Sequence, residues 1–122
     1  MVIHLLKAYH GIVQSYQILQ FEQAGQSSRL RMTIVFKDGS VLHVRETIIN
    51  GSKRKYSYHW QNENKKLLIR WDNADHWQVN TKPHHKHVEY QNQVEESYER
   101  TLEQVLIVIQ EKIGHGKDTK NM

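Results

Sequence analysis

Three histidines stand within four positions, His84, His85 and His87, directly after Pro83, the only proline of the chain. They close a segment, residues 70–87, that also contains a fourth histidine and two of the three tryptophans. Histidine titrates near neutral pH, so a cluster of this density can exchange protons, hold a metal ion or bind an anion. Proline fixes its own φ and disfavours helix before it, so the run starts from a rigid bend. If the run is extended, His85 and His87 share one face.

Arg70 and Asp72 carry opposite charges at the start of the same segment. Cleavage of a phosphodiester without metal needs a base for the attacking hydroxyl, an acid for the leaving oxygen and a cation for the charge that develops on phosphorus. We therefore assign His85 and His87 as the acid–base pair, Arg70 as the phosphate clamp and Asp72 as the orienter of a histidine. The candidate substrate-binding residues are Lys86, His84, Lys55, His59 and Tyr58.

Two other kinds of function compete for this segment. Imidazole and carboxylate ligands suit zinc, manganese or iron, although Lys86 and Arg70 would repel a cation. The ligands of that alternative site are Asp72, His76, His85 and His87. The second alternative is a binding module whose basic surface docks nucleic acid or an acidic protein without chemistry. A polar loop whose imidazoles simply face water is the structural alternative to all three.

The composition predicts one domain over residues 1–114, followed by a disordered polar tail over residues 115–122. A chain of 122 residues can bury a real core. It has no cysteine, so it has neither disulfides nor thiolate metal ligands. No apolar run is long enough to cross a bilayer, and the N-terminus does not have the layout of a signal peptide. We expect a cytoplasmic protein that needs no cofactor, with its oligomeric state left open.

Positive charge is concentrated around the histidine-rich segment. The formal net charge is +4. Residues 53–88 contain eight Lys or Arg against three Asp or Glu, whereas residues 89–122 contain four against seven. Such a field would attract a polyanion. Basic side chains that only solvate hairpin tips are the alternative explanation of the same charge.

Alternating polar and apolar residues predict five consecutive strands. These strands are expected at residues 12–23, 29–36, 40–49, 53–61 and 67–72. Two Gly-containing turns, Asp38-Gly39 and Asn50-Gly51, separate three of them and have the composition of type I′ hairpins. Sequential strands joined by short turns usually pair.

Helical periodicity appears at both ends of the chain. Residues 2–10 form a short amphipathic pattern. Near the C-terminus, Thr101 and Gln104 form a capping box, apolar residues then recur on one face, and Gly114 is expected to end the helix. The sequence thus predicts an α+β fold, a five-stranded antiparallel meander with a short N-terminal helix and a C-terminal helix packed on one face.

Three strings in this order resemble the TumE family of bacterial toxin–antitoxin toxins. They are residues 56–61 (YSYHWQ), 68–74 (LIRWDNA) and 83–87 (PHHKH). The family usually has Ala-Pro-His-His after the Asp-Asn pair, where this chain has Ala74-Asp75-His76-Trp77, so it departs from the pattern at His76. The resemblance implies a growth-inhibiting toxin and a co-encoded antitoxin, which we expect to bind DNA. Small toxins of this kind often cut RNA, so the analogy favours a ribonuclease.

Overall fold

One antiparallel sheet forms the body of the protein, and each strand pairs with its neighbour in sequence, in the order β1-β2-β3-β4-β5-β6-β7. The computed structural model describes residues 2–73, 85–88, 93–96 and 100–120; within residues 85–88, 93–96 and 115–120 it describes the backbone alone. The strands are β1 (Val13–Ala24), β2 (Ser27–Phe36), β3 (Val41–Ile49), β4 (Lys53–Gln61), β5 (Leu67–Asp72), β6 (His85–Val88) and β7 (Gln93–Glu96).

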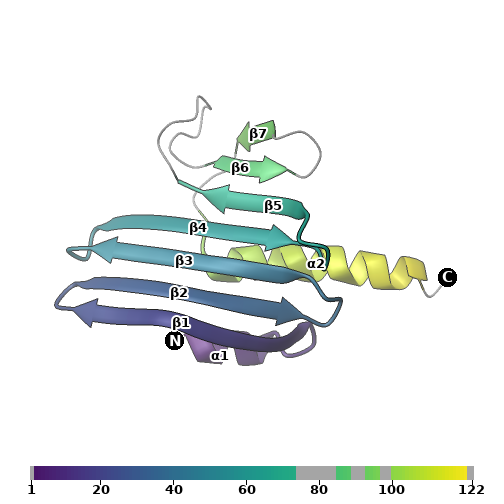
Figure 1. Ribbon diagram of the computed structural model, residues 1–122, viewed down its shortest axis with the longest axis horizontal. Helices are drawn as coiled ribbons and strands as arrows, with labels where there is room; N and C mark the ends of the chain where they lie inside the picture. The colour runs from purple at the N-terminus through teal and green to yellow at the C-terminus, as the bar shows by residue number, and fades with distance from the viewer. Residues whose placement is uncertain (1, 74–84, 89–92, 97–99, 121–122) are drawn as a thin grey trace.

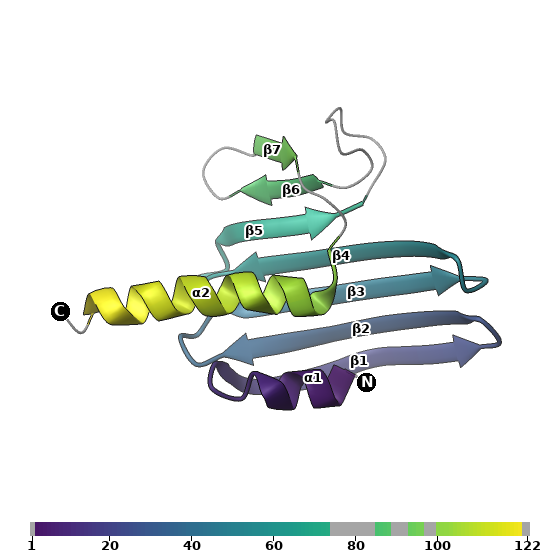
Figure 2. The ribbon, with the colours of Figure 1, turned by 180° about the vertical axis from the view of Figure 1, so that it is seen from behind.

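Both helices, α1 (Val2–Ala8) and α2 (Leu102–Lys120), lie on the same face of the sheet. Figure 1 views the opposite face, and Figure 2 shows the two helices in front of the strands. We call the side with the helices the covered face and the other side the open face. The predicted α+β fold is confirmed: β1 to β5 are the expected meander, and β6 and β7 extend it. Residues 89–99 have no alternating pattern, so the sequence did not predict β7.

The core lies between the helices and the covered face, and alternation along each strand decides which residues enter it. On β2, for example, Met32, Ile34 and Phe36 are buried, whereas Thr33 and Val35 between them are only half-buried. A strand directs successive side chains to opposite faces, so the pattern fixes the face of every residue. The largest fully buried side chains are Trp71, Tyr58, Phe36, Met32, Ile34, Leu42, Leu106, Ile109, Val44 and Val105.

The two predicted hairpin turns differ in geometry. At Asn50-Gly51 both residues have positive φ, 53° and 72°, as a type I′ turn requires. At Asp38-Gly39 the positive φ, 90°, belongs to Gly39 and not to Asp38, so the type I′ expectation is wrong there. Instead, a carboxylate oxygen of Asp38 accepts hydrogen bonds from the backbone N–H of Ser40 (2.9 Å) and from its hydroxyl (2.5 Å). The Asp38 side chain therefore closes a longer loop.

The predicted capping box starts α2. The backbone N–H of Thr101 donates to the Gln104 side chain (3.0 Å), and the backbone N–H of Gln104 donates to the Thr101 hydroxyl (3.3 Å). These two bonds satisfy donors that lack a partner inside the helix. At the other end, the helix continues through Gly114 to Lys120, so Gly114 does not end it. A single glycine costs a helix about 1 kcal/mol relative to alanine, which does not force a helix to stop.

A partly buried polar cluster lies on the covered face next to the core. The Tyr58 hydroxyl donates to the Glu46 carboxylate, and Arg54 donates to the same hydroxyl (2.5 Å) and to Glu46 (3.2 Å). Burial, with the nearby Glu46 carboxylate as a second cause, raises the pKa of Tyr58 far above its usual range. The phenol thus stays neutral and acts as a structural hydrogen-bond donor.

Leu106→Ala should lower the free energy of unfolding by about 2–5 kcal/mol, because Leu106 is fully buried and its loss leaves a cavity. Urea denaturation measures the change. The matched control is Ile107→Ala, since Ile107 is 42% exposed on the same helix and should cost within about 0.5 kcal/mol. Equal effects from the two substitutions would contradict the observed packing of α2.

Tyr58→Phe should lower the free energy of unfolding by about 1–3 kcal/mol at neutral pH, because Glu46 loses one of its two hydrogen-bond donors and Arg54 loses an acceptor. The difference in free energy of unfolding between the wild type and this variant should become smaller as the pH rises above about 10. At such pH tyrosine ionises in the unfolded chain, while the folded state keeps Tyr58 protonated. In that range this group destabilises the wild type by about 1.4 kcal/mol per pH unit, and the phenylalanine variant lacks the effect. Unfolding curves of both proteins across this range test the prediction; a constant difference would contradict it.

Candidate functional site

Arg70 stands at the centre of a row of residues that crosses the open face from strand to strand. It pairs in register with His59 on β4, and His59 pairs with His43 on β3. On its other side Arg70 pairs with His87 on β6. Residues opposite one another in antiparallel strands lie on the same face of the sheet. The register therefore places three histidines and one arginine in a single row, which we call the histidine row.

Asp72 holds Arg70 from the neighbouring position on the same strand. The Nε of Arg70 donates to a carboxylate oxygen of Asp72 at 3.1 Å. The Asp72 side chain is 7% exposed, whereas that of Arg70 is 44% exposed. A buried carboxylate beside a solvent-facing guanidinium fixes the arginine at its Nε. The two Nη groups have no partner among the described side chains, so they remain able to bind an anion.

His43 and His59 are in ring contact on adjacent strands. Their ring centroids lie 5.9 Å apart with an interplanar angle of 58°. His43 is exposed and His59 is half-buried, so the pair is accessible from the open face. His59 was predicted from the sequence as a substrate-binding residue, and His43 was not predicted. Strand alternation contained part of the signal, because it sets both histidines on the open face of adjacent strands. A two-residue turn at Asn50-Gly51 would instead pair His43 with Tyr58, so the turn did not predict their contact.

Strand β6 brings the histidine-rich run to the same region. Its register sets His85 opposite Asp72 and His87 opposite Arg70, so the backbone brings all four predicted catalytic residues together. Lys86 takes the position opposite Trp71, which is buried on the covered face. The side chains of β6 lie outside the described residues.

The remaining predicted residues fall into three groups. His76 and His84 lie outside the described residues. Lys55 is exposed on the open face, two register rows from His59. Tyr58 is fully buried on the covered face, so it lies on the opposite side of the sheet from His59. Among the side chains that are described, no group of three or more His, Asp or Glu could hold a metal ion.

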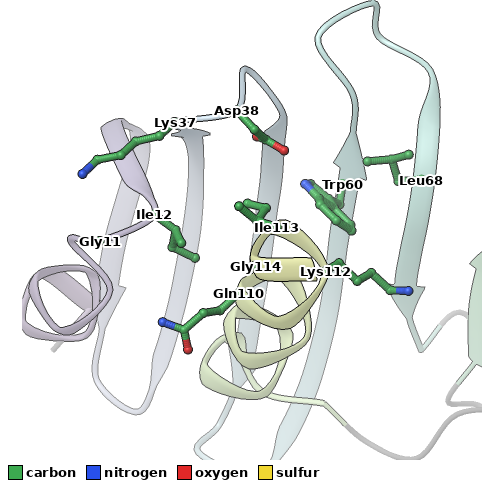
Figure 3. A pocket seen from close by; sticks show the side chains of 10 residues that line it. All are labelled: Gly11, Ile12, Lys37, Asp38, Trp60, Leu68, Gln110, Lys112, Ile113 and Gly114. Atoms are coloured by element: carbon green, nitrogen blue, oxygen red, sulfur yellow. The ribbon is translucent and has the colours of Figure 1, made fainter. Parts of the chain in front are cut away.

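A pocket of about 480 Å³ lies on the covered face, between the middle of α2 and the loops at one end of the sheet. Figure 3 shows Ile113 of α2 and Trp60 of β4 in its wall, with Asp38 at its rim. Trp60 is 4% exposed, and its Nε1 has no hydrogen-bond partner in the described part of the chain. The pocket contains none of the predicted site residues, and the sheet separates it from the histidine row.

The comparisons with known proteins give one positive finding. The family model described as "Toxin TumE" matches residues 2–113, which is nearly the whole chain. No curated protein and no solved structure matches. Over the described residues, no helix has the length and apolar character needed to span a membrane. The match reaches from α1 to α2 and includes every strand that carries the histidine row, and the chain belongs to the TumE toxin family.

Proposed function

We propose that this toxin inhibits growth by cleaving RNA at the histidine row without a metal ion. The carrying observation is the register His59–Arg70–His87, which sets an arginine between two histidines on three adjacent strands. Adjacent strands lie about 4.8 Å apart, so the two histidine positions are separated by roughly 10 Å. A phosphate bound over Arg70 would have one histidine on each side.

That arrangement suits in-line displacement. One histidine, as the base, takes the proton of the 2′-hydroxyl, and the 2′-oxygen attacks phosphorus. The other, as the acid, gives a proton to the departing 5′-oxygen, so the products are a 2′,3′-cyclic phosphate and a free 5′-hydroxyl. The attacking and leaving oxygens lie on opposite sides of phosphorus, and therefore the base and the acid must as well. We assign these two roles to His59 and His87.

Arg70 stabilises the charge that builds up on the phosphate oxygens during this step. Its ion pair with Asp72 uses Nε, which leaves the two Nη groups for the nonbridging oxygens. We therefore assign Asp72 the role of positioning Arg70. The sequence predicted a different role, in which Asp72 orients a histidine. Both roles are compatible, because His85 lies opposite Asp72 in the register.

The second histidine of the open face, His43, is assigned to hold His59. Ring contact on an adjacent strand restricts how far the His59 imidazole can turn.

Membership of a toxin family implies an antitoxin as partner. We propose that this partner is encoded by the neighbouring gene and binds DNA; reading that gene tests this part.

His59→Ala and His87→Ala should each abolish RNA cleavage and growth inhibition, and the double variant should be hardly worse than either one. Residues that act as a catalytic unit are strongly non-additive. The readouts are colony formation after induction and cyclic-phosphate ends on the RNA products. The matched control is His4→Ala, because His4 is an exposed histidine on α1. If both site variants keep their toxicity while remaining folded, the histidine row is not the active site.

Arg70→Lys should also inactivate the enzyme, because lysine keeps the charge but loses both the Nε contact to Asp72 and the bidentate fork. Cleavage by the wild type should be unchanged by EDTA. The alternative metal site predicts the reverse, namely loss of activity with EDTA and a small effect of Arg70→Lys. Measuring initial cleavage rates under both conditions separates the two.

A further inference from the structure

Arg31 and Arg45 form a second charged position on the open face. They pair directly in register across β2 and β3, and both are exposed. Their outer neighbours in the row, Gln20 on β1 and Ser57 on β4, are uncharged. Within the described residues, neither arginine has a carboxylate partner.

Two like charges directly opposite one another destabilise an antiparallel pair. Their Cα atoms are only about 4.5–5.5 Å apart, so the guanidinium groups repel each other unless an anion lies between them. Elsewhere in the described chain, arginines such as Arg54 and Arg70 have a carboxylate partner. The Arg31–Arg45 pair is therefore arranged for an external anion.

The location indicates which anion. Arg31 and Arg45 lie two residues along their strands from the histidine row, which corresponds to about 7 Å. One row further on, Lys55 is exposed as well, and Arg29 faces Glu22 on β1. Cations at regular steps along one flat surface suit a ligand whose negative charges repeat, as the phosphates of a nucleic-acid strand do.

We propose that Arg31 and Arg45 together bind a phosphate of single-stranded RNA that flanks the phosphate held at Arg70. This subsite rests on the proposed function for the identity of its ligand. A single strand can lay consecutive phosphates on an open sheet, and it can bring its 2′-hydroxyl into line with the scissile bond. An A-form duplex holds that hydroxyl out of line.

Binding to a short single-stranded oligoribonucleotide with 2′-O-methyl sugars tests the proposal, because this probe cannot be cut by 2′-attack. Fluorescence anisotropy at several salt concentrations should give weaker binding for the double variant R31Q/R45Q than for the wild type. Its plot of log affinity against log salt should be shallower by about 0.7, the value for one phosphate contact on a single strand. R31K/R45K keeps both charges and should keep the slope.

The matched control is K37Q/K112Q, which removes the same charge from two exposed lysines at the pocket on the covered face. It should bind the probe with the wild-type slope. An unchanged slope in R31Q/R45Q, or an equal change in the control, would overturn the subsite. Tighter binding of a 2′-O-methyl duplex than of the single strand would overturn the assignment to single-stranded RNA.

The same assay keeps this proposal separate from the proposed function. If the wild type binds in the predicted way but never cuts RNA, the subsite stands and the ribonuclease falls. If it cuts RNA and R31Q/R45Q binds normally, the ribonuclease stands and the subsite falls.

Discussion

The antiparallel register of the meander is the constraint on which the rest of this structure depends. Side chains alternate with a period of two, so a slip of one residue between neighbouring strands would move a whole apolar set to the other face. Here the register sets Met32 opposite Val44 and Val44 opposite Tyr58, so buried residues meet buried residues across three strands. The same register necessarily aligns the residues between them. His43, His59 and Arg70 meet on the open face because their neighbours meet in the core.

The two helices cover one face only, which divides the sheet into a structural side and a chemical side. On the covered face, Trp71 and Tyr58 are buried in one core cluster with residues of α2, and the polar atoms of Tyr58, Glu46 and Arg54 satisfy one another. No described helix or strand covers the open face, and its described side chains include several arginines and histidines. A charged group there keeps its hydration and costs little, whereas on the covered face each charge needs a partner.

The exception on the open face is Asp72, which is nearly fully buried at the junction of β5 and β6. Its carboxylate holds Arg70 at 3.1 Å. The next residue, Asn73, bonds through its side chain to the backbone of β4. Its side-chain oxygen accepts a hydrogen bond from the Tyr56 N–H (2.9 Å), and its side-chain nitrogen donates one to the Arg54 carbonyl (2.7 Å). The Asp72-Asn73 pair therefore anchors the point where the chain leaves β5, which keeps the proposed site in a fixed position on the sheet.

Much of the fold could be predicted from local sequence, because alternation, capping and turn residues act over a few positions. The meander, both helices and the capping box of Thr101 follow from such patterns. The turn at Asp38-Gly39 shows where local signals compete. A type I′ turn centred there would pair Val35 with Leu42 and so oppose an open-face residue to a core residue. Core burial requires the observed pairing of Ile34 with Leu42, and the loop adapts.

The proposed site divides in the same way. Its residue types, and the placing of His43 and His59 on the open face, were determined by the sequence, since strand alternation sets the face of each residue. Their pairing was not, because a two-residue turn at Asn50-Gly51 would pair Ile49 with Ser52, whereas the structure pairs Ile49 with Lys53. The pairing of β5 with β6 was not, because no tight turn joins Asp72 to His85. Only the tertiary structure decided that His87 lies opposite Arg70. Without a short turn, a register depends on the packing of the whole sheet, and no local pattern in the chain encodes it.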